Sequence, residues 1–174
     1  LSLKKPWKLG NETFSSGSVV ALPLGEALKK IKNPKKIHTL WKPSPVEALG
    51  SVHPLKEGVL IHGLRNVKGH FFLVERKRGR WNQSKDLNLD RQGHLTFIAG
   101  SGDKNLFLFN SESFVKPSAL YSFDIKKRKK RLLKKLDPQF DAKDVVVKQN
   151  FATSADGTKV PYFVVGKKSF IRKG

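Results

Sequence analysis

Residue types that can do chemistry are present in this sequence, but their spacing assembles no site. Five histidines occur, at positions 38, 53, 62, 70 and 94, and none lies at a metal-ligand spacing from another. Eight residues separate His53 from His62, which is not a metal motif by itself. We therefore interpret all five as core or surface histidines.

A serine between glycines, in Gly100-Ser101-Gly102-Asp103, comes nearest to a nucleophile motif. It is not the G-x-S-x-G of a nucleophile elbow, and its flanking segments are both strand-like, whereas an elbow joins a strand to a helix. A turn is the better interpretation. Asp103 and Asn105 offer a cation only two side chains, which make no cage.

Other site chemistry is missing from the sequence. It has no phosphate loop, no carboxylate pair at a readable spacing and no cysteine, so disulfides and thiolate metal sites are excluded. We assign no catalytic, cofactor-binding or metal-binding residue and expect no cofactor. No run of eighteen apolar residues occurs, so no membrane span is expected. The compartment is left unassigned.

Short strands separated by breaks account for most of the chain. We predict a hairpin within residues 1–16, a strand at 18–22, a helical stretch at 25–31 that Asn33-Pro34 ends, and a strand at 36–41. Two groups of four strands follow. The first comprises residues 48–54, 58–64, 69–76 and a weak polar strand at 81–87; the second comprises residues 94–99, 105–109, 119–125 and 131–136.

The second group begins about 45 residues after the first, a spacing typical of β-propeller blades. Periodicity alone supports a two-sheet sandwich equally well. The missing Trp-Asp signature argues against a WD-repeat propeller. The fold class is therefore all-β, with about two to three blades or a sandwich as the open alternatives.

The formal net charge of +21 raises the question of a nucleic-acid partner. Most of the excess is spread along the chain, but Lys126–Lys135 holds eight basic residues in ten. This run lacks the interleaved aromatic residues that stack on bases. We favour a solvated basic turn between strands, with a basic nucleic-acid-binding module as the alternative.

Residues 145–165 form the most informative stretch. Strands at 145–153 and 159–165 are predicted, joined by a turn in which Gly157 takes a positive φ and Asp156 bonds the local backbone. The second strand is apolar on both faces and so expects cover on both. Only nine residues follow it. Together with a first residue that is not Met, this suggests a segment of a larger protein.

Two motifs resemble the prolyl oligopeptidase family of serine peptidases. Ser113–Asp124 (SFVKPSALYSFD) is similar to the S-F-x-x-P-x-x-x-Y-x-x-D signature of the family's last propeller blade. Val147 and Gln149, followed by Thr153–Pro161 (TSADGTKVP), look like the family's return into its hydrolase domain. Weaker similarity extends back through residues 65–73 and 17–24.

The resemblance implies a seven-bladed propeller that caps an α/β-hydrolase domain, which cleaves short, proline-containing peptides with a Ser-Asp-His triad. It implies that residues 1–138 are C-terminal propeller blades and that residues 139–174 are a linker and the first hairpin of the hydrolase. The family's triad lies in its hydrolase domain beyond this hairpin, so no residue here is assigned to it. The segment is expected to be inactive alone, the propeller limiting substrate size.

The partners implied are the rest of the same polypeptide and, for the whole peptidase, short peptides. A partial propeller leaves strand edges uncovered, so self-association is also expected. Two other hypotheses remain: the nucleic-acid-binding module named above and a stand-alone propeller-like scaffold.

Overall fold

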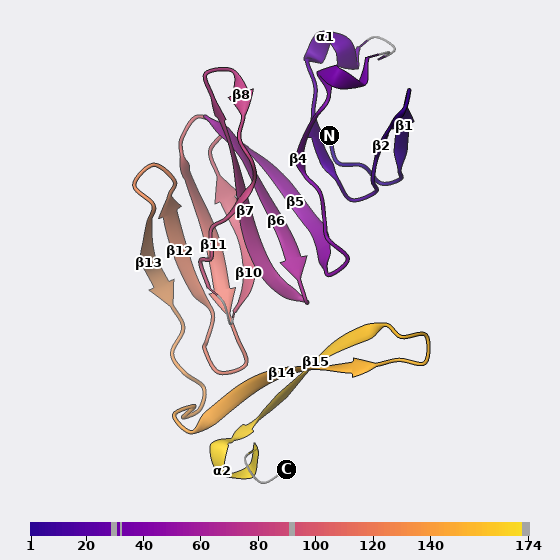
Figure 1. The fold of residues 1–174 in the computed structure, drawn as a ribbon. Helices are drawn as coiled ribbons and strands as arrows, with labels where there is room; N and C mark the ends of the chain where they lie inside the picture. Colours follow the sequence, from indigo (N-terminus) through magenta and orange to yellow (C-terminus); the bar gives the residue numbers. More distant parts are fainter. Residues whose placement is uncertain (29–30, 32, 91–92, 172–174) are drawn as a thin grey trace.

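The computed structural model describes residues 1–28, 31, 33–90 and 93–171 (Figure 1). Nearly all of its regular structure is antiparallel β-sheet. In the part of the chain it describes, no helix is long and apolar enough to cross a membrane. The fold has a small N-terminal region, two stacked sheets and a separate hairpin.

The N-terminal region contains two short strand pairs. The predicted hairpin is formed by β1 (Trp7–Leu9) and β2 (Glu12–Phe14), and β3 (Val19–Ala21) pairs with β4 (His38–Trp41). Between them lie a helix, α1 (Leu24–Ala27), and a 3-10 turn, η1 (Pro34–Lys36).

Within the described residues, the helix is shorter than the helical stretch predicted at residues 25–31. It begins one residue early and covers Leu24–Ala27, while residues 29, 30 and 32 lie outside the described residues. Leu24 and Leu28 are 75% and 81% exposed, so no apolar face is buried to extend the helix. The side chain of Asn33 accepts a hydrogen bond from the Lys35 backbone and caps η1.

The first blade is a meander in chain order. Its strands are β5 (Glu47–Leu55), β6 (Gly58–Arg65), β7 (Lys68–Lys77), β8 (Arg80–Trp81) and β9 (Lys85–Asp86). The prediction of one continuous outer strand at 81–87 is wrong, because β8 and β9 pair separately with β7. The residues between them are Asn-Gln-Ser, which offer no apolar side chain to hold a strand against the sheet.

The second blade repeats the meander, with β10 (His94–Gly100), β11 (Leu106–Glu112), β12 (Ala119–Asp124) and β13 (Lys129–Lys135) in the order β10-β11-β12-β13. The basic run is only partly a turn. Its first three residues, 126–128, form the turn, and the rest is β13, whose seven residues are all exposed. Among the described strands, β13 forms the outer edge of this sheet and pairs only with β12.

Aromatic and aliphatic side chains fill the space between the two blades. Leu60, Phe71 and Leu73 of the first blade pack against Leu95, Phe107, Phe109 and Phe123 of the second. The Phe71 ring lies 5.2 Å from Phe107 and 5.7 Å from Phe109. No described strand passes from one sheet to the other, so the two sheets are successive blades of a partial propeller and not a Greek-key sandwich.

The hairpin agrees closely with its prediction. β14 (Val145–Thr153) pairs with β15 (Lys159–Lys167), which runs two residues past the predicted end and leads into α2 (Lys168–Ile171). Gly157 has a φ of +84°, and the Thr158 backbone donates to Asp156. Hydrogen bonds from Ser154 and Thr158 lower the pKa of Asp156 to about 2.

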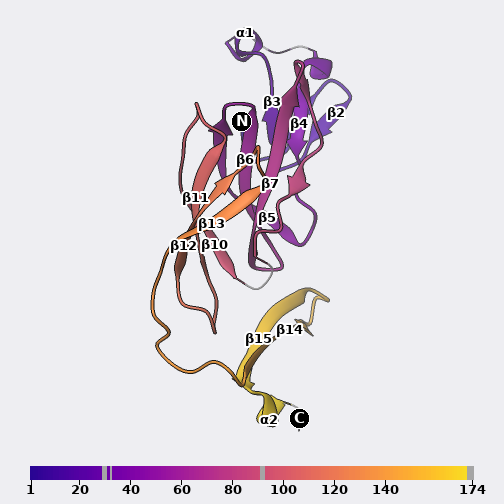
Figure 2. The same ribbon diagram turned by 90° about the vertical axis from the view of Figure 1, so that its left-hand side faces the viewer.

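The hairpin lies apart from the two blades and is reached by an extended connection (Figure 2). Gln149 and Phe163 are on the face that contacts the blades, because they are paired in register and both have blade partners. The opposite face is open, with Val160, Tyr162 and Val164 at 47%, 45% and 36% exposed. Within the described residues, nothing covers this apolar face of β15.

Candidate functional site

The residues considered for chemistry in the sequence do not come together. Within the described ranges, no group of three or more His, Cys, Asp or Glu side chains could hold a metal ion. Ser101 lies in the predicted turn, where its hydroxyl accepts a hydrogen bond from the Asp103 backbone. His38 and His94 are exposed, and His53 and His62 lie in the space between the blades. Only His70 joins a polar cluster.

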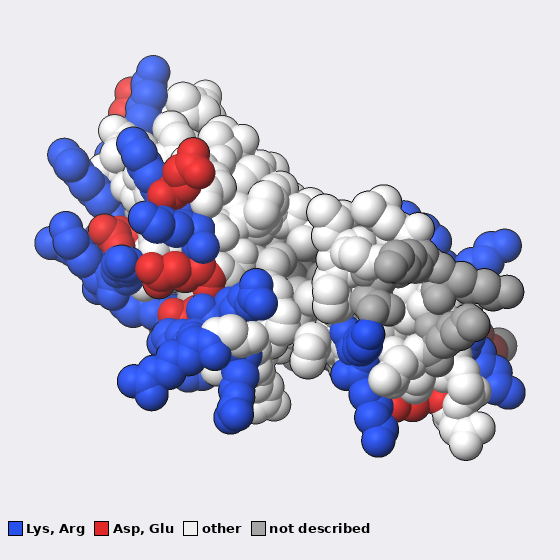
Figure 3. Space-filling model, turned by 90° about the horizontal axis from the view of Figure 1, so that it is seen from above, with Lys and Arg blue, Asp and Glu red and all other residues white. Residues whose placement is uncertain are grey.

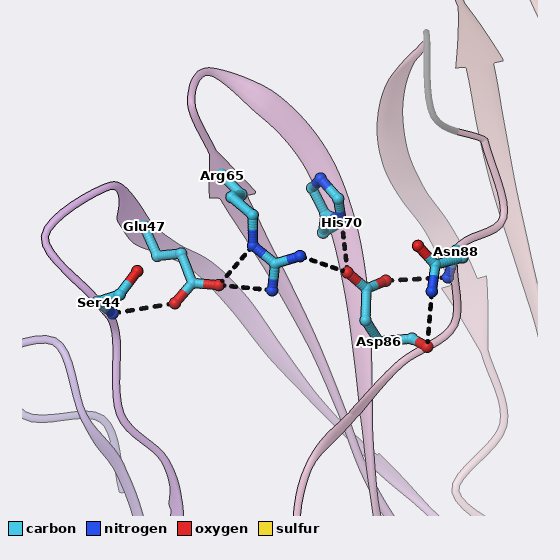
Figure 4. A network of polar contacts seen from close by, with 6 residues as sticks. All are labelled: Ser44, Glu47, Arg65, His70, Asp86 and Asn88. Atoms are coloured by element: carbon cyan, nitrogen blue, oxygen red, sulfur yellow. Dashed lines mark hydrogen bonds and ion pairs between the residues drawn. The ribbon is translucent and has the colours of Figure 1, made fainter. Parts of the chain in front are cut away.

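That cluster, the polar network of Ser44, Glu47, Arg65, His70, Asp86 and Asn88, spans the first blade (Figure 4). The Arg65 guanidinium lies between two carboxylates, with Nη2 2.8 Å from Glu47 Oε1 and Nη1 3.0 Å from Asp86 Oδ2. His70 Nδ1 lies 2.7 Å from the same Asp86 oxygen. The network therefore links four strands, β5, β6, β7 and β9.

The two carboxylates are held ionised by their neighbours. Burial alone would raise the pKa of Asp86, but hydrogen bonds from His70 and the Asn88 backbone, with the charges of His70 and Arg65, lower it below its usual value. Burial would also raise the pKa of Glu47, but hydrogen bonds from the Ser44 backbone and from Arg65 outweigh it and lower the pKa. Ionised carboxylates that already accept hydrogen bonds brace the blade and do not donate protons.

The turn that follows Arg65 connects the polar network to the hairpin. Asn66 and Val67 have φ values of +48° and +61°, and Arg65 pairs with Lys68 across them, as in a tight two-residue hairpin turn. The Asn66 carbonyl accepts a hydrogen bond of 2.8 Å from the Gln149 side chain of β14. We call this turn and its hairpin contacts the seam.

Aromatic contacts complete the seam. The Phe163 ring of β15 lies 5.3 Å from Phe114, in the connection between β11 and β12, and the Lys68 ammonium lies 5.9 Å from the Phe163 ring. Beside Phe163 is an open cleft of about 480 Å³, whose apolar walls include Val67, Phe114 and Pro117. A smaller hollow of about 260 Å³ lies between Lys68, Val115 and β14.

Sequence reasoning missed the seam residues on the blade side. Asn66 and Lys68 lie in residues 65–73, a segment that showed only weak family similarity. Phe114 lies in the motif Ser113–Asp124, and nothing in the sequence pairs it with Phe163. The signal available was Gln149, which is conspicuous as a polar residue on the apolar face of β14. Its partner lies 83 positions away in the chain, so spacing alone could not identify it.

Comparison with known proteins gives a consistent set of relatives, although no protein-family model matches the chain. The chain is 27% identical over 166 residues to an uncharacterised peptidase of Rickettsia prowazekii, covering 95% of this chain and 23% of that protein. It is 28% identical over 169 residues to an uncharacterised peptidase of Sinorhizobium fredii, with the same coverage of 95% and 23%.

A solved structure agrees with these relatives. The post-proline cleaving enzyme from Rickettsia typhi matches with a TM-score of 0.80 and 26% identity, over 96% of this chain and 24% of that enzyme. This chain therefore spans about a quarter of the length of the proteins it matches.

Proposed function

We propose that the chain belongs to the prolyl oligopeptidase family of peptidases and that it forms the closing part of the propeller in a serine oligopeptidase. In this proposal residues 1–138 are propeller blades and residues 139–174 are a linker and the hairpin that opens the hydrolase domain. The segment itself contributes no catalytic residue. The observation that carries the proposal is the match of nearly the whole chain, blades and hairpin together, to one peptidase structure.

The hairpin supports the same division. Its blade face makes the few contacts of the seam, and its outer face exposes Val160, Tyr162 and Val164. An apolar strand face of this kind is stabilised by a further layer of structure. An α/β-hydrolase domain formed by the same polypeptide is the partner we propose for it.

The proposed contribution of the blades is to limit substrate size. A stack of blades closed by interblade packing admits an extended peptide more readily than a folded protein. Peptide hydrolysis, including cleavage beside proline, would then take place in the hydrolase domain with its own Ser-Asp-His residues.

A segment exchange tests this function. Residues of the Rickettsia typhi enzyme that align with this chain are replaced by the chain itself, and hydrolysis of a short proline-containing peptide is measured. We expect the hybrid to be active and sensitive to a serine-directed inhibitor, and the 174-residue chain alone to be inactive. Hydrolysis by the chain alone would refute the non-catalytic assignment.

A variant hybrid provides the control. Gln149→Ala with Phe163→Ala removes both hairpin contributions to the seam and should lower activity, whereas Lys143→Ala, an exposed change in the linker, should not. A hybrid that folds but stays inactive in every form would count against the proposed function.

A further inference from the structure

The turns at the end of the two blades that lies away from the hairpin (Figure 1) are rich in Lys and Arg. We define the basic end as residues 56–57, 75–80, 101–104 and 124–131, which form the turns at this end. These residues include twelve Lys and Arg and four Asp and Glu. Seen from above, many blue side chains extend from this part of the molecule, with red ones lying among them (Figure 3).

The acidic residues of the basic end are largely occupied within the fold. Lys126 lies 3.4 Å from Glu57, and Arg128 lies 3.5 Å from Glu75, so both pairs join the second blade to the first. Lys77 shares Glu75 at 3.4 Å. These pairs hold the turns together but leave most of the positive charge uncompensated.

The uncompensated charge continues along β13. Lys129 and Arg131 have no ion-pair partner in the described part of the chain, and register places both on the face of β12 that carries Ser122 and Asp124. Lys130 is on the opposite face, where its ammonium donates to the Leu89 carbonyl at 2.8 Å and lies over Tyr121. Lys129 and Arg131 are therefore two cations on one face of this strand that have no ion pair within the described residues.

The backbone of β13 is also free on one side. In the part of the chain that the structure describes, it pairs with β12 alone, so its outer row of N–H and C=O groups is open to a further strand. Leu132 and Leu133 are each 46% exposed and add apolar surface beside the basic residues. An open strand edge that carries several cations and two exposed leucines has the features of a peptide receptor.

We propose that β13 and the basic end bind an extended acidic peptide by strand addition. The main chain of the peptide would pair with β13, and acidic side chains at alternate positions would meet Lys129 and Arg131. A peptide fits better than a nucleic acid, because the strand edge offers backbone donors and acceptors beside Lys129 and Arg131, while residues 126–135 contain no aromatic side chain for base stacking.

The test measures binding of the full chain to a fluorescent decapeptide of alternating Glu and Thr. We expect binding that weakens with added salt and that falls at least about tenfold in K129Q/R131Q, as for the loss of charge-assisted contacts. The matched control is K143Q/K148Q, which removes the same charge from exposed positions in the linker and hairpin and should leave binding unchanged. Circular dichroism checks that both variants keep the fold.

Two further probes separate the alternatives. The same decapeptide N-methylated at alternate residues keeps its charge but cannot form the ladder, and we expect it to bind at least about tenfold more weakly. Equal binding of the two peptides, or an equal loss of binding in K129Q/R131Q and K143Q/K148Q, would overturn strand addition. Tighter binding of a single-stranded oligonucleotide that K129Q/R131Q abolishes would favour the nucleic-acid alternative instead. None of these outcomes depends on peptidase activity, so failure of this proposal would leave the proposed function untouched, and the reverse also holds.

Discussion

Val67 shows most directly how a single residue stores strain in this fold. A β-branched side chain at a φ of +61° crowds its own backbone, which costs about 1–2 kcal/mol. The turn holds it there because the strands on either side pair through Arg65 and Lys68. The seam thus rests on a turn in which glycine would be the unstrained residue.

Val67→Gly should therefore stabilise the chain by about 1 kcal/mol, since relief of the strain outweighs the added backbone entropy. The midpoint of urea unfolding measures this. Val46→Gly is the control, because Val46 is equally exposed, at 52% against 50%, but is not at a positive φ. A gain of the same size in both variants would contradict the strain argument.

Two histidines in the space between the blades provide a residue-scale response to acid. The His53 ring stacks on Phe97 at 3.4 Å, and the buried Nε2 of His62 has no hydrogen-bond partner among the described residues. Burial lowers the pKa of both, and the charge of His62 adds to the effect on His53. The nearby backbone of Leu95 opposes part of the shift in His62.

The direction of these shifts fixes the pH dependence. Above the ordinary value of 6.5 both imidazoles are neutral in folded and unfolded chains and contribute nothing. As the pH falls below 6.5, the unfolded chain takes up protons that the folded chain resists, so the free energy of unfolding decreases. We expect H53Q/H62Q to flatten this decrease between pH 7.5 and 5, measured by urea unfolding. H38Q changes an exposed histidine and should retain it.

At the scale of elements, the polar network acts as a brace across four strands. Asp86 is its centre, accepting from Arg65, His70 and the Asn88 backbone. Asp86→Asn should cost about 1–3 kcal/mol, because the amide cannot accept from all three and leaves a partner unsatisfied. Thermal unfolding measures the loss, and Asp137→Asn, at an exposed position, is the matched control.

The polar network also makes the stability of the folded chain depend on pH in a second, more acidic range. The lowered pKa values of Glu47 and Asp86 stabilise the folded chain fully above their ordinary values of 4.5 and 3.8, and this stabilisation is lost as the pH falls below them. Asp86→Asn should therefore lose part of the acid dependence below pH 4.5 but keep the dependence that the histidines cause. A variant unchanged in both ranges would contradict the role given to the network.

Strand positions were largely predictable because alternation and turn residues are local signals. The hairpin turn at Asp156-Gly157 and the start of β6 at Gly58 both follow from such signals. The break between β8 and β9 was not predicted, since a polar segment beside a sheet gives no pattern. The seam and the polar network depend on pairs such as Gln149 with Asn66 that only the fold brings together.

At the scale of the whole molecule, uncovered strand surfaces govern how the chain would assemble. The outer face of the hairpin and the open edge of β13 are both uncovered. We expect the isolated chain to form dimers or larger assemblies through the hairpin, as light scattering would show. V160K/Y162K should reduce the average mass, whereas V46K, at an exposed site on the first blade, should not. A monodisperse monomer would contradict this expectation.

The connection between β13 and β14 has a consequence for how the hairpin is held. It consists of nine residues, 136–144, of which all but Ala142 are exposed. A flexible tether of this length has a root-mean-square span of about 17 Å and keeps its ends at a millimolar effective concentration. The contacts of Gln149 and Phe163 in the seam then form within one molecule, although the same contacts would bind a detached hairpin only weakly. The tether makes docking of the hairpin independent of protein concentration.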